Sequence, residues 1–157
     1  MRKMYFVGAG LFIGFMCFAI IVSGARLTQF INLPSFIMVA GCTFVLLLAN
    51  FNLREMGRAF TVGFRKKEES PEDLKKGYIF FKSMRLYLII SGLLGTITGA
   101  MAMLVNLRDS SRIGNGVSLA ILTLLYGIVF STLITIPFTT GIKKRLIEQG
   151  ESLSMNE

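Results

Sequence analysis

Hydroxyl side chains are the groups within the apolar blocks of this sequence that could take part in chemistry. A set of six lies in the second half of the chain, at Thr96, Thr98, Thr123, Ser131, Thr132 and Thr135. A hydroxyl can bond a protonated carboxyl group or help to hold a cation without carrying a fixed charge. Hydroxyls in membrane helices also commonly donate to their own backbone or join neighbouring helices, and that structural role is the default alternative.

Other kinds of chemistry find little support in the sequence. There is no histidine, and the two cysteines, Cys17 and Cys42, fall inside apolar blocks and are expected to be small buried hydrophobic residues. No glycine-rich phosphate loop with a lysine occurs, and every acid except Asp109 lies in a polar segment of the cytoplasmic side predicted below. The sequence therefore predicts no enzyme, no metal site and no cofactor.

The apolar residues are gathered into four blocks, each long enough to cross a bilayer. Only 17% of the residues are charged, against about 25% in an average soluble protein. A spanning helix needs about 20 apolar residues, and blocks without strand-like alternation predict helices. We expect an all-α polytopic membrane protein with four transmembrane helices, at about 4–24, 33–50, 86–107 and 116–140.

The distribution of basic residues predicts the orientation. The net charge of +8 is compatible with nucleic-acid binding, but retention of Lys and Arg on the cytoplasmic side of a membrane explains it better. All but three of the 17 basic residues fall on one side of the four blocks, and the exceptions are Arg26, Arg108 and Arg112. We therefore expect both termini in the cytoplasm of a bacterium, a multi-pass protein of its inner membrane, and no nucleic-acid partner.

Four segments follow from this arrangement. Residues 1–52 hold the first two spans with a short outer link, and residues 53–85 form a short basic cytoplasmic segment. Residues 86–147 form a transmembrane hairpin of spans three and four, and residues 148–157 form a polar tail. Cleavage of the first 25 residues as a signal peptide is an alternative, although their apolar run is longer than a typical signal peptide has.

The basic segment contains two predicted helices. Leu53, Met56, Phe60 and Phe64 recur at three- and four-residue spacing, which predicts an amphipathic helix on the membrane surface or an extension of span two. Ser70 followed by Pro71 and two acids is typical of a helix start, and this helix is expected to run on into span three.

Five stretches of the sequence carry a recognisable pattern. They are Phe30-Ile-Asn-Leu-Pro-Ser-Phe-Ile-Met-Val-Ala-Gly-Cys-Thr43, Gly92-Leu-Leu-Gly-Thr-Ile-Thr-Gly99, Arg112-Ile-Gly-Asn-Gly116, Ala120-Ile-Leu-Thr-Leu-Leu-Tyr-Gly127, and Pro137 with the basic residues that follow it. Together they resemble the MotA/TolQ/ExbB proton-channel family, and its MotA-like branch in particular. The most specific part is the hairpin of spans three and four, and the similarity covers about two-thirds of the chain.

The resemblance implies a ring, typically of five copies, around a MotB/TolR/ExbD-like single-span partner that carries a membrane Asp. Passage of H+ rather than Na+ would neutralise that Asp and move one component against the other. By match, Thr96 and Thr123 would line the ion path, and Pro137 would have a torque-related conformational role. Helix packing or partner contact would fall to Gly92, Gly95, Gly99, Tyr126 and Gly127.

The sequence also departs from the family pattern. Leu124 replaces the second Thr of a Thr-Thr pair, and Ile89 and Cys42 replace a family proline and glycine. Loss of an oxygen ligand suits a proton path better than a sodium site, which needs several oxygens. The inner segment has only about 35 residues, whereas the resemblance implies a much larger cytoplasmic domain at this place in flagellar members. The motor could be a flagellar stator or a reduced motor for another envelope process, and the short segment favours the reduced motor. A non-conducting structural or assembly protein and a small carrier are the alternatives.

Overall fold

The chain folds into helices that are separated by short connections. The computed structural model describes residues 2–24, 26–64, 69–105, 107 and 110–150, with side chains from residue 7 on and without those of residues 110–112. No strand occurs in these described ranges. The elements are α1 (Arg2–Val22), the 3₁₀ helix η1 (Leu27–Phe30), α2 (Leu33–Asn50), α3 (Leu53–Phe64), α4 (Pro71–Val105), α5 (Ser110–Phe130), the π-helical segment η2 (Ser131–Thr135) and α6 (Ile136–Glu148).

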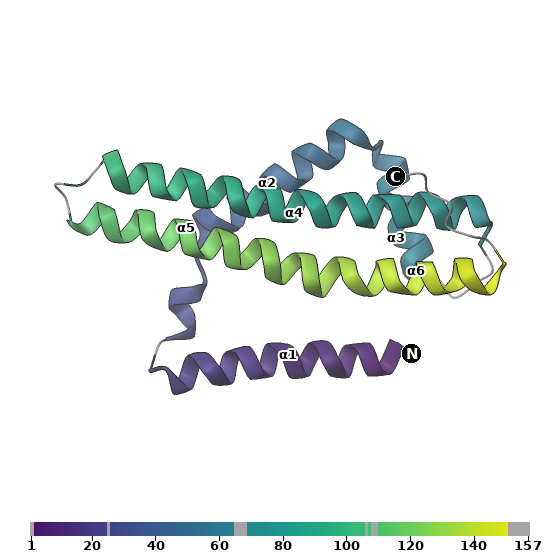
Figure 1. Ribbon diagram of the computed structural model, residues 1–157, viewed down its shortest axis with the longest axis horizontal. Coiled ribbons are helices and arrows are strands. Elements are labelled where there is room, and N and C mark those ends of the chain that lie inside the picture. Colours follow the sequence, from purple (N-terminus) through teal and green to yellow (C-terminus); the bar gives the residue numbers. More distant parts are fainter. Residues whose placement is uncertain (1, 25, 65–68, 106, 108–109, 151–157) are drawn as a thin grey trace.

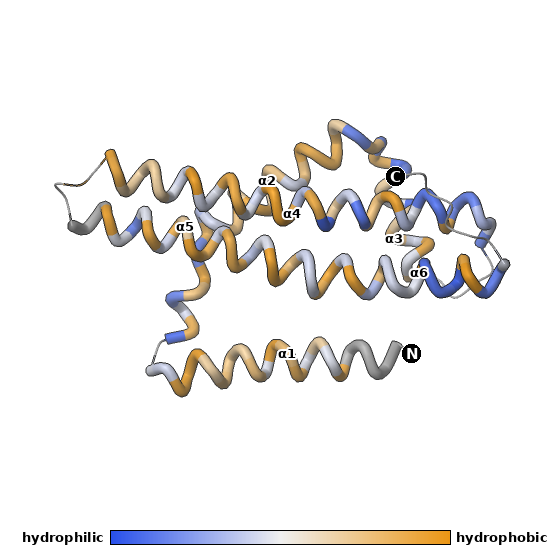
Figure 2. Tube along the Cα trace, in the orientation of Figure 1, coloured by the Kyte–Doolittle hydropathy of each residue, from blue (hydrophilic) through white to orange (hydrophobic). Residues whose placement is uncertain are grey.

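Three helical stretches are long and apolar enough to cross a membrane, which makes this a multi-pass membrane protein. They are Leu27–Asn50, Pro71–Val105 and Ile113–Glu148. The part of α1 whose side chains are described, Val7–Val22, is apolar but shorter than these, so the fourth span remains a prediction. Polar residues concentrate where α3, the start of α4 and the end of α6 meet (Figure 2). Arg2, Lys3, the basic run 65–67, Arg108, Asp109 and most of the tail 148–157 fall outside the residues or side chains that the structure describes.

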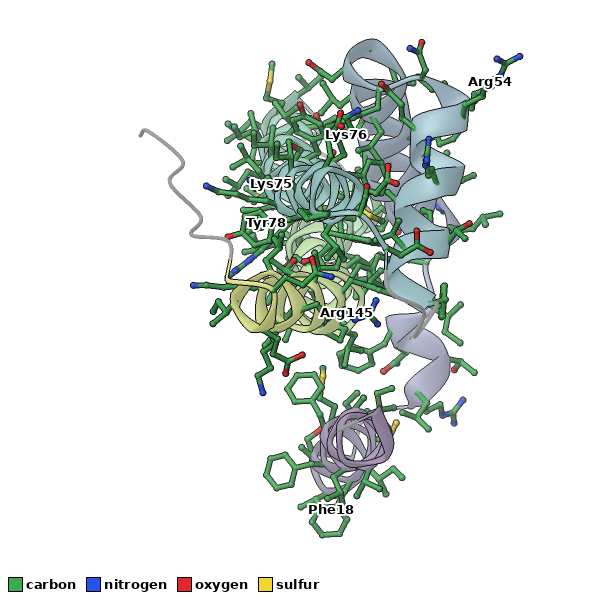
Figure 3. All side chains as sticks on the ribbon, turned by 90° about the vertical axis from the view of Figure 1, so that its right-hand side faces the viewer. Phe18, Arg54, Lys75, Lys76, Tyr78 and Arg145 are labelled. Atoms are coloured by element: carbon green, nitrogen blue, oxygen red, sulfur yellow. The ribbon has the colours of Figure 1, made fainter. Side chains whose placement is uncertain are left out.

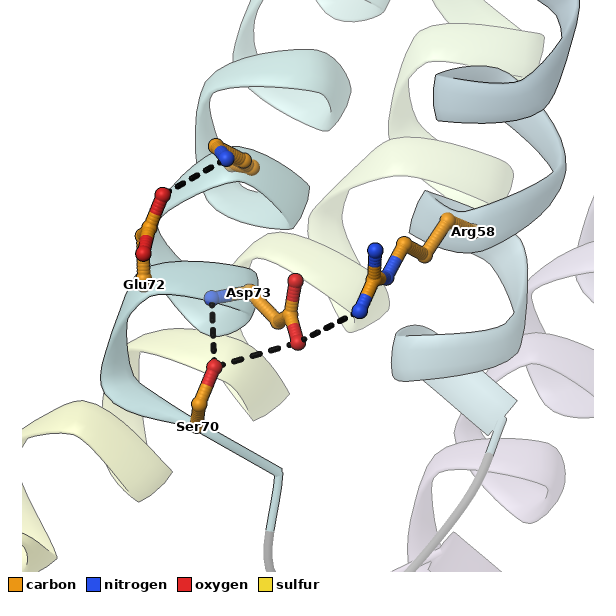
Figure 4. A network of polar contacts seen from close by, with 5 residues as sticks. Arg58, Ser70, Glu72 and Asp73 are labelled. Carbon is orange, nitrogen blue, oxygen red and sulfur yellow. Dashed lines mark hydrogen bonds and ion pairs between the residues drawn. The ribbon is translucent and has the colours of Figure 1, made fainter.

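The longest helix, α4, begins at the predicted Ser70-Pro71 start and continues without a break through the third span. The Ser70 hydroxyl accepts a hydrogen bond from the backbone N–H of Asp73 at 3.3 Å, which satisfies one of the free donors of the first turn. Arg58 from α3 pairs with the Asp73 carboxylate at 3.1 Å, and Lys76 pairs with Glu72 at 2.7 Å (Figure 4). The cap and the Lys76–Glu72 pair stabilise the first turns of α4, and the Arg58–Asp73 pair joins them to α3.

The amphipathic helix α3 is not an extension of the second span, because the chain bends at Phe51 and Asn52 before α3 begins. Met56, Ala59 and Val62 pack against α4 and α6 instead, while the predicted apolar residues Leu53 and Phe64 at its two ends stay exposed. The resulting inner cluster of buried residues comprises Leu47, Met56, Ala59, Val62, Leu74, Phe80, Phe81, Ile142 and Leu146. Arg145 of α6 donates to the backbone carbonyl of Val62 at 3.0 Å, near the end of α3. Residues from four helices therefore meet at this end of the molecule.

The first helix stands apart from the rest. Two views at right angles show α1 separated from α2, α4, α5 and α6, and connected to them through η1 (Figures 1 and 3). Phe15 and Phe18 of α1 are 71% and 64% exposed. The turn after α1 uses Gly24 in a left-handed conformation with φ of 74°, which glycine adopts without steric cost.

The helix that forms the predicted fourth span contains a π segment just before a proline. Pro137 lacks the N–H that would donate to the preceding turn, and its ring would clash with the carbonyl four residues back in a regular α-helix. Five residues from Ser131 to Thr135 are π-helical, and α6 resumes with Pro137 in its first turn. The wider π turn offers a physical reason why the helix continues past this proline.

Candidate functional site

The candidate site is the contact between α4 and α5, which run antiparallel along much of their length (Figure 1). Five glycines line this contact, which we call the glycine contact: Gly92, Gly95, Gly99, Gly116 and Gly127. In lipid, small residues let helix backbones approach closely, which is a main source of attraction between membrane helices. The spacing of glycines in α4 therefore sets how near α5 can come.

The closest approach is at Gly99. A Cβ atom placed on Gly99 would lie 2.5 Å from the backbone nitrogen of Ala120 and 2.7 Å from the carbonyl oxygen of Gly116. A Cβ on Gly116 would in turn lie 2.9 Å from the Gly99 oxygen. Both obstacles are backbone atoms, so a larger residue cannot be accommodated by a side-chain rotation.

Gly92 and Gly127 face each other closer to the inner cluster. A Cβ on Gly127 would lie 2.7 Å from the Leu88 carbonyl oxygen and 3.1 Å from the Gly92 Cα. Gly92, Gly95 and Gly127 are all buried in the single chain. These glycines thus contact the neighbouring helix of their own chain.

Thr96 lies on α4 at the edge of this contact and is half-buried. Its hydroxyl oxygen is 3.0 Å from two backbone carbonyl oxygens, those of Gly92 in α4 and Ala120 in α5. A hydroxyl has one proton to donate, so it serves one carbonyl at a time or is shared between them. The oxygen of Thr96 keeps its capacity to accept a hydrogen bond.

Thr123 lies on α5 directly opposite Gly95 and is 0% exposed. A Cβ on Gly95 would lie 2.6 Å from the Thr123 Cβ, so the threonine occupies the space that the glycine leaves free. Its hydroxyl is within reach of the carbonyls of Leu119 at 2.8 Å and Ala120 at 3.1 Å. The predicted pair therefore converges on the Ala120 carbonyl, with Thr96 at the surface and Thr123 beneath it.

The remaining hydroxyls bond to their own helices. Thr98 donates to Leu94 O at 2.9 Å and is exposed. In and around η2, Ser131 and Thr132 both donate to the Ile128 carbonyl at 2.8 Å, and Thr135 donates to Ser131 O. Such bonds to the preceding turn are common in membrane helices and tend to bend them.

Tyr126 and Pro137 complete the predicted set. The phenol of Tyr126 binds the backbone of the segment between η1 and α2, accepting from Asn32 N at 2.9 Å and donating to Phe30 O at 2.5 Å. Pro137 lies in the first turn of α6 directly after η2, and it is half-buried. Neither residue is part of the contact at Thr96 and Thr123.

A buried polar contact between α2 and α4 was also not predicted from the sequence. Thr43 of α2 donates to the Ser91 hydroxyl of α4 at 3.1 Å, and both side chains are buried. Ser91 is one residue before the glycine stretch, and Thr43 ends the stretch that resembles the start of span two. A hydroxyl at the small-residue face of each helix is the only signal that would have suggested the pair.

The sequence model of the MotA/TolQ/ExbB proton channel family matches residues 55–155. Motility protein A of Borreliella burgdorferi (strain ATCC 35210 / DSM 4680 / CIP 102532 / B31) is 30% identical over 95 residues, which is 60% of this chain and 36% of the relative. Motility protein A of Aquifex aeolicus (strain VF5) is 40% identical over 53 residues, covering 34% of this chain and 21% of the relative.

The chemotaxis protein PomA of Vibrio alginolyticus is 37% identical over 54 residues, covering 34% of this chain and 21% of the relative. The chain thus spans about a fifth to about a third of the length of these curated relatives. The family match includes α3, α4, α5, η2 and α6, and therefore the whole candidate site. On this match the chain belongs to the MotA/TolQ/ExbB proton channel family, as a relative of its MotA-like members.

Proposed function

We propose that this chain is a ring-forming subunit, in about five copies, of a proton-driven membrane motor. It would work with a MotB/TolR/ExbD-like single-span partner and convert ion flow into movement of the joint complex. The observation that carries the proposal is the family match over residues 55–155, the segment that contains the α4–α5 hairpin. Relatives named as motility protein A and PomA favour the motor branch of the family.

The hairpin of α4 and α5 has no acid along its apolar length. No Asp, Glu, Lys, Arg or His occurs between Leu86 and Val105 or between Ile113 and Thr140. Ionisable side chains usually mark ion paths in membranes, so a path along this hairpin needs its titrating group from another chain. An Asp on the partner's single span would supply it.

Thr96 would then be the residue that meets the partner's carboxyl group. It is half-buried in the single chain, whereas Thr123 is fully enclosed between α4 and α5. Thr123 would support it from the interior, because both hydroxyls lie within hydrogen-bond reach of the Ala120 carbonyl. When Thr96 turns its proton away from the Gly92 and Ala120 carbonyls, it can donate to a carboxylate.

We also propose where this motor lies and what process it drives. We place the chain in the bacterial inner membrane with four spans and both termini in the cytoplasm, as the basic residues at the inner end favour. The motor would be a flagellar stator or a reduced motor of another envelope process. Pro137 and the π segment would give α5 and α6 a bend through which motion reaches the inner cluster.

A non-conducting structural or assembly protein is the second candidate, and one observation favours it. Thr96, Thr98, Thr123 and Thr132 all lie within hydrogen-bond reach of backbone carbonyls. That is the ordinary structural behaviour of hydroxyls in membrane helices. A small carrier is a third possibility that no contact in the described part of the chain favours.

Substitution of the two threonines separates the first two candidates. Thr96→Val with Thr123→Val keeps the side-chain shape and removes both hydroxyls. The motor proposal expects loss of ion-dependent output in cells that contain the partner, with the assembled ring still recovered after purification. Thr98→Val is the matched control, because Thr98 is exposed and bonds only its own helix.

If output survives the double substitution, the two threonines have no part in conduction. A second test uses the protein alone in liposomes. Because the titrating Asp belongs to the partner, we expect no sustained selective proton current in its absence. A robust current without the partner would contradict the proposal.

A further inference from the structure

Tyr126 makes two hydrogen bonds to a segment that lies more than 90 residues earlier in the chain. Its oxygen accepts from the backbone N–H of Asn32 at 2.9 Å and donates to the carbonyl of Phe30 at 2.5 Å. A phenol can do both at once, since it has one proton and free lone pairs. One side chain of α5 therefore serves both a donor and an acceptor of the η1–α2 junction.

The junction needs these partners because its backbone is not helical. Ile31 and Asn32 are extended, with φ, ψ of −102°, 98° and −122°, 109°. Other polar groups here already have partners: Ile31 N donates to Thr28 O at 3.2 Å, and Asn32 O accepts from Phe36 N at 3.0 Å. The Asn32 side chain caps α2 by accepting from Ser35 N. The Asn32 N–H and the Phe30 carbonyl are the groups that Tyr126 binds.

Those two hydrogen bonds matter because of how deep in the membrane the junction lies. Gly127, the neighbour of Tyr126, contacts Gly92, and α4 continues from Gly92 to Val105 for about 20 Å of helix. That outer part of α4 exposes large apolar side chains at Leu93, Leu94, Ile97, Met101, Leu104 and Val105. Figure 1 shows η1 and the start of α2 beside α5 well short of the α4–α5 turn. Non-helical backbone at bilayer depth is tolerated only where protein or trapped water satisfies it.

We propose that Tyr126 is a positioning residue that holds the η1–α2 junction inside the membrane, and with it the point from which α1 departs. The ring of Tyr126 stacks on Phe130 with centroids 5.7 Å apart, and Phe130 in turn meets Phe36 of α2 edge-on at 5.9 Å. These ring contacts do not need the phenol oxygen. Tyr126→Phe therefore removes both hydrogen bonds and leaves the aromatic packing in place.

Residue-resolved hydrogen exchange of the full chain in lipid nanodiscs tests this inference. In the unmodified protein, the Asn32 amide is expected to exchange slowly although it lies outside a helix. In Tyr126→Phe, the unpaired groups draw in water, and exchange at Asn32 is expected to rise by up to about tenfold, the equivalent of one hydrogen bond. The Ser35 amide, which Asn32 Oδ1 accepts from, is expected to change less.

Tyr78→Phe is the matched control, because Tyr78 packs against the inner cluster, far from the junction. It is expected to leave the Asn32 amide unchanged. Equal exchange at Asn32 in the unmodified protein and in Tyr126→Phe overturns the inference, and so does an equal rise in both variants. If Tyr126→Phe folds poorly, the unmodified protein still decides, since an Asn32 amide that exchanges as fast as an unstructured one contradicts the bond. None of these readouts depends on ion flow, so a result that overturns this inference leaves the proposed function untouched.

Discussion

The glycine contact and the inner cluster hold their helices together in opposite ways. At the glycine contact, backbones touch because side chains are absent: Gly92, Gly99 and Gly127 lie against backbone atoms of the facing helix. In the inner cluster, large side chains fill the space between helices, and the rings of Phe81 and Phe138 stack with centroids 4.5 Å apart and an interplanar angle of 7°.

We attribute the difference to the solvent on each side, since residues 53–85 are predicted to lie outside the bilayer. Lipid is as apolar as a leucine side chain, so burial of large residues gives helices in a bilayer little reason to associate, and close backbone packing takes over. Outside the bilayer, removal of aromatic surface from water drives packing directly. The inner cluster is thus built like a small soluble domain, whereas the glycine contact is built like a membrane interface.

Removal of a large side chain from the inner cluster is expected to have the largest effect. Phe81 is fully buried and contacts the rings of Phe60, Phe80 and Phe138. Phe81→Ala should cost about 3–5 kcal/mol of unfolding free energy, the usual range for a buried Phe. Hydrogen exchange should rise in α3 and α6 while the outer half of α4 stays protected. If the whole hairpin loses protection together, the two regions do not unfold separately.

Addition of one methyl group at the glycine contact comes next. Gly99→Ala places a Cβ against backbone atoms of Ala120 and Gly116, so the helices must move apart. We expect a loss of about 1–3 kcal/mol, the usual cost of overpacking, seen as a lower unfolding temperature in detergent. Gly41→Ala is the matched control, because no heavy atom lies within 4 Å of the added Cβ. A stable Gly99→Ala protein would mean that the contact is looser than described.

Much of this contrast could be predicted from local sequence patterns. The Gly-rich stretch of α4 predicts a close helix contact, and Ser70 with Pro71 predicts where α4 begins, because both signals lie within a few neighbouring residues. The apolar spacing of Leu53, Met56 and Phe60 likewise predicts an amphipathic helix. What covers that helix could not be predicted, since its partners in α4 and α6 are distant in the sequence.

The polar contacts show the same limit. Tyr126 with Asn32, and Thr43 with Ser91, join residues that are 94 and 48 positions apart. No spacing rule connects such residues, because their meeting depends on how the helices dock. The enclosure of Thr123 opposite Gly95 also depends on that docking, so the sequence could suggest Thr96 and Thr123 as a pair but not which one lies at the surface.

A helix cap at the inner end is expected to matter less than a buried ring. Ser70→Ala removes the hydroxyl that accepts from Asp73 N and donates to Asp73 Oδ2, and it keeps both partners of the Arg58–Asp73 pair. The expected cost is about 1 kcal/mol of unfolding free energy, measured by thermal unfolding alongside Thr61→Ala. Thr61 is the control because its exposed hydroxyl only donates to Gly57 within α3. Equal losses in both variants would show that the cap contributes nothing of its own.

The smallest effect is expected at Thr43 and Ser91, which join α2 to α4 beside the glycine contact. Hydrogen bonds between membrane helices average about 0.6 kcal/mol, so Thr43→Val should cost about that much. Thr43→Val together with Ser91→Ala should cost little more, since replacement of both partners leaves no unpaired group behind. Thr98→Val, which removes an exposed hydroxyl, gives the baseline in the same unfolding measurement. A cost of several kcal/mol for Thr43→Val would mean that this end of the molecule also depends on side-chain contacts, and the contrast with the inner cluster would then fail.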